Sequence, residues 1–197
     1  MMAILDKLLR RARNDPLWDR YLNQPPADPN ADMTIAIRTA PTGSIFPAKS
    51  TVPEPGRMAS DLFELVSFFG GSAMGVVANA TWARHQPING AELNDLSTLP
   101  HLIVFGVRLD IDPDKSPGIG GQHVRREAAT IVFSVGAYIR ELGYEAIVCP
   151  FDKAVAKSAG VEASRNLFVA DDAVLTNLPL TYGAAKLPDT PVSAQRQ

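Results

Sequence analysis

The 197-residue chain is poor in cysteine, in net charge and in long apolar runs, and each of these absences excludes a class of function. It contains one cysteine, Cys149, so it can form no internal disulfide and cannot supply the several thiolates of a zinc or iron–sulfur site. Its formal net charge is −2 and its charges are interspersed, so it lacks the basic surface that binds nucleic acids and anionic membranes. No apolar run approaches the ~20 residues of a membrane span, and no secretory signal follows Arg10 and Arg11. The sequence therefore predicts a cytoplasmic protein that binds neither nucleic acid nor membrane.

The composition is typical of one globular domain. Hydrophobic residues make up 46% of the 197 positions, which is enough to form a substantial core. Residues 1–22 have helical spacing of apolar side chains and predict an N-terminal helix. Residues 23–55 form a proline-rich arm in which we expect no regular core element. The arm either wraps over a neighbouring surface or is mobile, and its candidate anchors are Ile35, Ile37, Ile45 and Phe46. Residues 56–180 read as the core and residues 181–197 as a C-terminal tail.

The core segment alternates helical and strand patterns. Helical spacing predicts helices over residues 58–69 and 124–142, while short apolar runs predict strands over 73–78, 102–109 and 145–149. The run LIVFGVRL at 102–109 is nearly continuous and typical of a central strand covered on both faces. We therefore predict an α/β fold of the α+β type, in which helices flank a mixed sheet and the helix 124–142 packs across it.

A glycine-rich loop opens the long helix. Free backbone N–H groups and the positive end of the helix dipole could bind an anion such as phosphate at Ser116, Gly118, Gly120 and Gly121. The loop matches neither the dinucleotide fingerprint nor a phosphate loop, and a flexible turn before a helix explains it as well. The histidines have no metal-binding spacing and read as surface residues; His123, in the first helical turn, is the one to test first.

Several separate motifs, in order, resemble the core of the reductive dehalogenase family. The segment 99–150 runs through an apolar strand, a glycine-rich loop and a long helix to a Leu-Gly-Tyr turn and a strand, and 61–82 resembles the helix and strand that precede it in the family. Downstream, residues 165–167 (Arg-Asn-Leu) and 175–180 (LTNLPL) resemble two further family motifs. This resemblance implies a nitroreductase-like fold that encloses a cobalamin-type corrinoid. If a corrinoid binds, we expect its polar edge and tail to lie against the glycine-rich loop and the corner at 165–166, because glycines let backbone N–H groups approach closely and helix starts favour an anionic phosphate. The candidate cofactor-binding residues are Ser116, Gly118, Gly120, Gly121, His123, Arg165 and Asn166.

The chain departs from the family pattern in two places. Ala163 and Ser164 stand in a stretch where the family has glycines close to the corrinoid, and their added side-chain atoms reduce the space for a macrocycle. After Leu180 there is no cysteine, whereas the family has its iron–sulfur ligands there. The resemblance thus implies a corrinoid-binding core without an iron–sulfur cluster, and it assigns no catalytic residue.

Three functions are compatible with these observations. The first is a corrinoid carrier, or a subunit that needs an external electron donor; the second is a non-catalytic scaffold or assembly subunit of a larger complex. The third, ranked behind, is a flavin-dependent reductase of the nitroreductase type, for which only Arg10, Arg11 and Arg13 could be offered. The apolar anchors of the arm predict that the chain forms a homodimer or joins another protein subunit.

Overall fold

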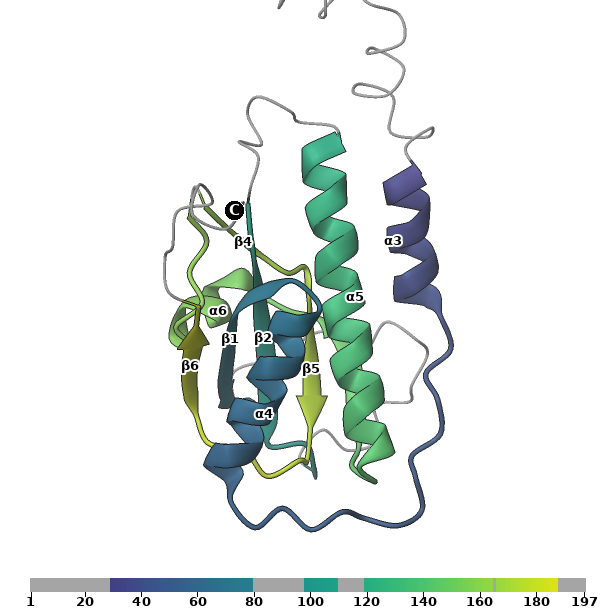
Figure 1. The fold of residues 1–197 in the computed structure, drawn as a ribbon, viewed down its shortest axis with the longest axis vertical. Helices are drawn as coiled ribbons and strands as arrows, with labels where there is room; N and C mark the ends of the chain where they lie inside the picture. Colours follow the sequence, from purple (N-terminus) through teal and green to yellow (C-terminus); the bar gives the residue numbers. More distant parts are fainter. Residues whose placement is uncertain (1–28, 80–97, 110–118, 165, 188–197) are drawn as a thin grey trace, which may run out of the picture.

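The computed structural model describes residues 29–79, 98–109, 119–164 and 166–187 (Figure 1). The N-terminal helix expected over residues 1–22 lies outside this part of the chain. The described helices are α3 (Pro29–Thr39), α4 (Pro55–Phe68), α5 (Ile119–Glu141) and α6 (Lys153–Ser158). The described strands are β1 (Gly71–Ala78), β2 (His101–Arg108), β3 (Ala146–Pro150), β4 (Leu167–Val169), β5 (Asp172–Thr176) and β6 (Gly183–Lys186). None of these helices is long and apolar enough to cross a membrane.

The strands form one sheet in the order β3-β5-β2-β1-β6, with β4 also paired to β2. All pairings between the described strands are antiparallel. Strand β2 lies near the centre, where Phe105 is paired with Met74 of β1 and Leu102 with Leu175 of β5. The predicted α+β class and the central position of this strand are both confirmed, whereas the sheet, predicted to be mixed, is antiparallel throughout the described strands.

Helices α4 and α5 cover one face of the sheet, and α6 lies on the other (Figure 1). Ile103 and Phe105 of β2 belong to the core cluster that contains α4 and α5, whereas Leu102 and Val104 belong to the cluster that contains α6. Alternate side chains of β2 are therefore buried on opposite faces. This explains why its sequence is almost continuously apolar.

Helix α5 begins at Ile119, five residues before the predicted start, and ends one residue before the predicted end. Ile131, Val135 and Ile139 are fully buried along its inner face. At its C-terminus the N–H groups of Gly143 and Tyr144 donate to Arg140 and Ile139, the Schellman arrangement. Gly143 has φ +82° there, a conformation that glycine adopts without strain.

The proline-rich arm contains a regular helix, contrary to the sequence prediction. Pro29 occupies the first helical position, where a missing N–H costs no hydrogen bond, and Pro41 comes only after α3 has ended. Residues 40–54 then run around the end of α5 to α4 (Figure 1). Phe46 and Ser50 donate backbone hydrogen bonds of 2.9 Å to the carbonyls of Arg140 and Leu142. The arm is thus attached to the C-terminal end of α5.

A buried ion pair joins α3 to the sheet. Arg38 lies 2.7 Å from Asp172 through Nε and Oδ2, and its Nη2 donates to Oδ1 at 2.8 Å. The Asp172 side chain is 4% exposed and that of Arg38 is 37% exposed. Burial raises the pKa of Asp172, and the guanidinium of Arg38 partly offsets that rise. The paired residues are 134 positions apart, so this contact fixes the arm to the core.

Both edges of the sheet are protected against further strand pairing. Strand β6 forms where the sequence predicted a tail; it has four residues and ends at Lys186. Strand β3 ends at Pro150, and its Ala146 carbonyl accepts a 3.0 Å hydrogen bond from Nη1 of the buried Arg140. Burial lowers the pKa of Arg140. Short edge strands, lysine, proline and covered carbonyls are the usual devices against edge association.

Candidate functional site

The best candidate is a cleft of about 310 Å³ at one end of β1, β2 and β6. Its floor comes from the ends of these strands, and one wall comes from the segment between α6 and β4. The lining residues are Ser72, Ala73, Arg108, Glu162, Ala163, Ser164, Asn166, Leu167, Lys186 and Leu187. Six of these ten side chains are polar or charged, so the cleft suits a ligand with hydrogen-bonding groups.

The wall segment is shaped by a glycine and by local hydrogen bonds. Gly160 has φ +74°, and a Cβ there would lie 2.7 Å from that of Ala184, so only glycine fits this turn against β6. Beyond it, Ser164 Oγ accepts from the Asn166 N–H at 3.3 Å. The Asn166 carbonyl accepts from the Leu109 N–H at 2.9 Å, which holds the segment against the end of β2.

The cleft lining contains two cationic side chains and one carboxylate. Arg108 and Lys186 contribute cations from the last residues of β2 and β6. The one carboxylate in the lining, Glu162, is 3.2 Å from Lys157, which lies outside the lining. Both members of that pair are well exposed, so solvent screens their charges.

Among the residues predicted from sequence, Asn166 lines the cleft. Ser116, Gly118 and Arg165 lie outside the described residues. Gly120 and Gly121 belong to the first turn of α5. Leu109, which follows β2, donates its N–H to the carbonyl of Asn166 in the cleft wall.

His123 is engaged within its own helix. Its Nε2 lies 3.0 Å from Glu127 Oε1, and its Nδ1 lies 3.0 Å from Arg126 Nη2. Because arginine can only donate, Nδ1 accepts and Nε2 carries the proton. This arrangement uses both ring nitrogens, and His123 is absent from the cleft lining.

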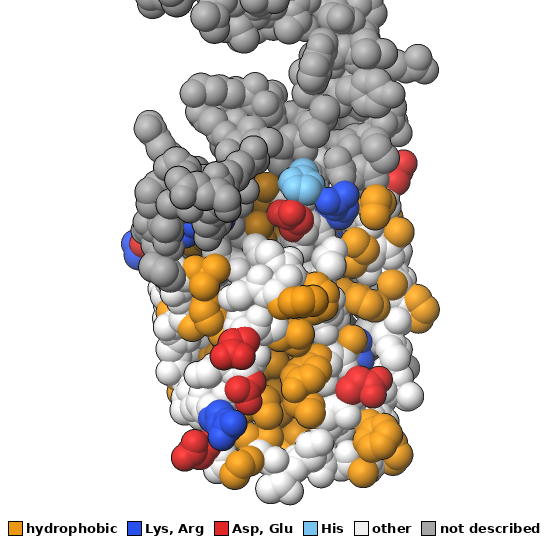
Figure 2. Space-filling model, in the orientation of Figure 1, with side chains coloured by type: hydrophobic (Ala, Val, Ile, Leu, Met, Phe, Trp, Pro, Cys, Tyr) orange, Lys and Arg blue, Asp and Glu red, His pale blue; other side chains and the backbone are white. Residues whose placement is uncertain are grey.

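A second cleft, of about 300 Å³, was not expected from the sequence. It lies between α4 and β6, and its apolar lining includes Phe63, Met74 and Val76, with Tyr182 beside them. Figure 2 shows the hydrophobic side chains gathered on the lower part of the face that carries α4 and α5. Sequence patterns missed it because β6 is a short run of small residues whose strand state depends on pairing with β1.

His101, predicted to be solvated, is partly buried at the start of β2. Its ring centroid lies 5.4 Å from that of Tyr182, and burial lowers its pKa. Its Nδ1 is buried without a hydrogen-bond partner among the described residues. A neutral imidazole therefore suits this position better than a charged one.

The described residues contain no cluster of three or more histidine, cysteine or acidic side chains that could bind a metal ion. Cys149 is fully buried in β3, its Sγ lies 3.7 Å from the Ala173 carbonyl, and burial raises its pKa well above the usual range. It therefore behaves as a small hydrophobic residue, as predicted from its position at the end of a strand.

Comparison with known proteins gives a likeness of fold. No protein-family model matches the chain, and no curated protein matches it by sequence. Among solved structures it is similar to the catabolic reductive dehalogenase NpRdhA, with a TM-score of 0.58 at 16% identity. The same enzyme in complex with 3-bromo-4-hydroxybenzoic acid gives 0.62 at 17%. A reductive dehalogenase structure described in terms of B12-dependent dehalogenation gives 0.57 at 16%.

These matches cover 87% of this chain but only 26% of each solved chain. The chain therefore spans about a quarter of the length of these dehalogenases. At such low identity the likeness establishes a shared fold, which agrees with the resemblance found in the sequence motifs.

Proposed function

We propose that this chain binds a cobalamin-type corrinoid and acts as a corrinoid carrier, or as a subunit that needs an external electron donor. The observation that carries the proposal is the position of the polar cleft. Its lining includes residues 162–164 and Asn166, which belong to the stretch that the sequence resemblance associates with the corrinoid, in a fold shared with a dehalogenase described as B12-dependent.

The lining of the cleft fits part of such a ligand. A corrinoid has amide side chains around its ring and, in cobalamin, a phosphate in its nucleotide tail. Lys186 and Asn166 can donate hydrogen bonds to those groups. A volume of about 310 Å³ is at the lower end of the roughly 300–1,000 Å³ of small-molecule sites, so it accommodates one edge or the tail. The rest of the ligand would remain available to a second protein, as a carrier requires.

Electron supply must come from elsewhere under this proposal. A bound corrinoid would supply a cobalt centre that reacts only after reduction. Cys149, the one cysteine of these 197 residues, is buried and protonated, so the chain offers no thiolate set to relay electrons. We therefore expect no dehalogenation by the isolated chain with a mild reductant.

Binding is tested by titration with cobalamin, followed by visible spectroscopy and calorimetry. Ser164→Trp places an indole in the cleft and should weaken binding by about tenfold or more. Ser158→Trp is the matched control, because Ser158 is exposed on α6 and is not part of the lining. Equal affinity in both variants would remove the cleft from the binding site.

A non-catalytic scaffold is the second candidate, and one observation favours it. Ala163 and Ser164, which replace family glycines, both line the cleft, so their side chains occupy space beside the proposed ligand. A chain that shows neither a spectral change nor heat with cobalamin, while remaining folded, would support this candidate.

A further inference from the structure

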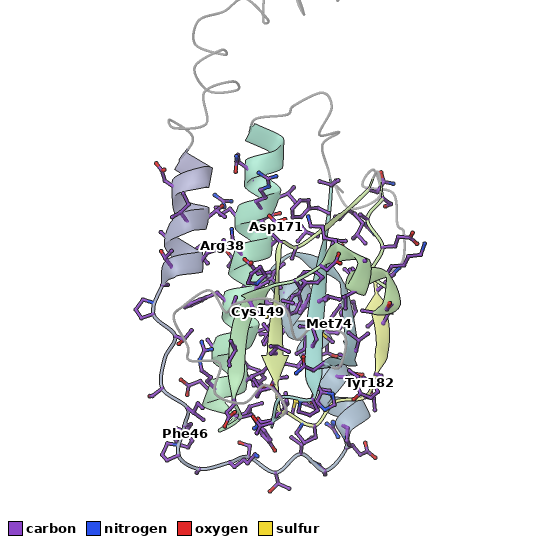
Figure 3. All side chains as sticks on the ribbon, turned by 180° about the vertical axis from the view of Figure 1, so that it is seen from behind. Arg38, Phe46, Met74, Cys149, Asp171 and Tyr182 are labelled. Carbon is purple, nitrogen blue, oxygen red and sulfur yellow. The ribbon has the colours of Figure 1, made fainter. Side chains whose placement is uncertain are left out.

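The second cleft has an apolar floor between two banks. One bank is α4 and the other is formed by residues 181–185, while Met74 and Val76 of β1 lie buried at the floor. The lining also includes the partly buried ring of Phe63. In Figure 3, Tyr182 lies below Met74, at the end of the molecule where β6 begins. A cleft of about 300 Å³ with such a floor suits the apolar body of a small molecule.

The α4 bank presents two neighbouring hydrogen-bond acceptors. Ser60 and Glu64 both line the cleft, and they are four positions apart on the helix, so their side chains are neighbours on the same side of it. The Ser60 hydroxyl donates to the Gly56 carbonyl at 3.3 Å, which leaves the lone pairs of its oxygen to accept. The Glu64 side chain forms no ion pair or hydrogen bond with the described residues. A positively charged donor can therefore bind to both oxygens.

The charge of this lining is negative. Among the described residues that line the cleft, Glu64 is the one that carries a charge. The neighbouring turns of α4 carry Arg57 and Asp61, whose opposite charges offset each other. The rings of Phe63 and Tyr182 also favour a cation, because the face of an aromatic ring attracts positive charge. The lining of the first cleft instead contains two cations and one carboxylate.

We propose that the second cleft binds a small organic cation, in which a compact apolar body carries a primary ammonium group. The apolar body lies on Phe63, Met74 and Val76. The ammonium donates to the Glu64 carboxylate and to the Ser60 hydroxyl oxygen. A primary ammonium has three donors and no acceptor, which matches two acceptors side by side. An anion of the same shape would meet the Glu64 carboxylate without a counter-charge and is disfavoured.

This site is separate from the proposed corrinoid site. The two clefts have no lining residue in common. Binding of an organic cation therefore needs no corrinoid, and the two proposals can be tested independently.

Calorimetric titration of the full chain at pH 7 with three probes of similar size tests the proposal. The probes are phenethylamine, which is protonated at this pH, the neutral 2-phenylethanol and the anion 3-phenylpropionate. We expect saturable binding of phenethylamine, with an affinity about fivefold or more above that of the alcohol, and no binding of 3-phenylpropionate.

Two substitutions at exposed positions of α4 test where the probe binds. Glu64→Gln keeps the shape of the side chain and removes its charge, so it should lower the affinity for phenethylamine about fivefold. Ser60→Trp places an indole in the cleft and should abolish binding. Asp61→Asn is the matched control, because Asp61 is exposed on α4 outside the lining, and its replacement should leave the affinity unchanged. Circular dichroism establishes that the variants are folded.

A folded chain that shows no saturable binding of phenethylamine, or that binds the three probes equally, would overturn the proposal. An affinity that Glu64→Gln leaves unchanged, or that Asp61→Asn lowers as much, would overturn the role of Glu64. Unchanged binding in Ser60→Trp would place the probe outside this cleft. All titrations are made without cobalamin, so their outcome does not depend on corrinoid binding.

Discussion

Replacing Arg38 with glutamine should destabilise the protein by removing the partner of a buried carboxylate. Asp172 has a 4% exposed side chain, and Arg38 is the one cation within ion-pair distance of it among the described residues. Glutamine retains much of the length of arginine and one N–H donor group, so the change mainly removes the positive charge and the two-pronged contact.

The expected loss of stability in Arg38→Gln follows from how deeply Arg38 and Asp172 are buried. Removing one member of a fully buried pair costs roughly 3–5 kcal/mol, because the other charge remains without compensation. Arg38 is 37% exposed, so solvent screens part of its interaction and the cost should be smaller. We expect a loss of about 2 kcal/mol in the free energy of unfolding. For a chain of this length that corresponds to a melting temperature lower by roughly 4–8 °C.

The loss should depend on pH in a defined direction. Burial already raises the pKa of Asp172, and without Arg38 the pKa rises further. A carboxyl whose pKa is raised in the folded state binds protons more tightly there, so stability falls as pH rises from the ordinary aspartate value through the folded-state pKa. The cost of Arg38→Gln should therefore be largest at neutral pH. It should shrink as pH falls toward about 4, where the carboxyl becomes neutral.

Urea unfolding followed by circular dichroism at pH 7 and pH 4 measures both effects. Lys157→Gln is the matched control, because the Lys157–Glu162 pair is exposed on both sides and its loss should cost well under 1 kcal/mol. If Arg38→Gln destabilises the protein no more than the control at pH 7, or by the same amount at both pH values, then the Arg38–Asp172 pair does not stabilise the fold in this way.

Four further outcomes follow from packing and burial. Gly136→Ala should stabilise the chain by about 0.5–1 kcal/mol in thermal unfolding, because its Cβ would have ordinary 3.5 Å contacts with Arg140 and Val148. Gly75→Ala should prevent folding, because its Cβ would collide with the Ala159 carbonyl oxygen. Ile139→Ala should cost roughly 2–5 kcal/mol in urea unfolding, since Ile139 is fully buried; a loss below 1 kcal/mol would contradict that packing. Cys149 should react with a thiol reagent only after unfolding, and rapid labelling of the native chain would contradict its burial and raised pKa.

Local sequence patterns were sufficient to predict the elements whose buried side chains recur at regular spacing. Strand β2 and helix α5 were predicted because β2 is covered on both faces and α5 buries one stripe, and both properties are visible in the order of apolar residues. Their observed ends differ from the predicted ones by one to five residues. The turn at Gly143 was likewise recognisable, since glycine is the usual residue at that helix end.

Helix α3 and strand β6 depend on contacts between distant residues. Proline composition suggested irregular structure in the arm, but the prolines at 29 and 41 bracket α3 and leave its interior free. Its position is fixed by Asp172, far along the chain. The candidate cleft likewise depends on distant contacts, because Ser72 meets residues 162–164 and 166–167 only where the sheet brings their strands together. The family motif at 165–167 pointed to Asn166, whereas no motif in the sequence pointed to Lys186.

The most direct test of the central claim is a visible absorption titration of the full chain with cobalamin, with calorimetry on the same samples. We expect a saturable spectral change and measurable heat at a ratio of one cobalamin to one chain. No spectral change and no heat at tens of micromolar cobalamin, from a chain that remains folded, would contradict corrinoid binding.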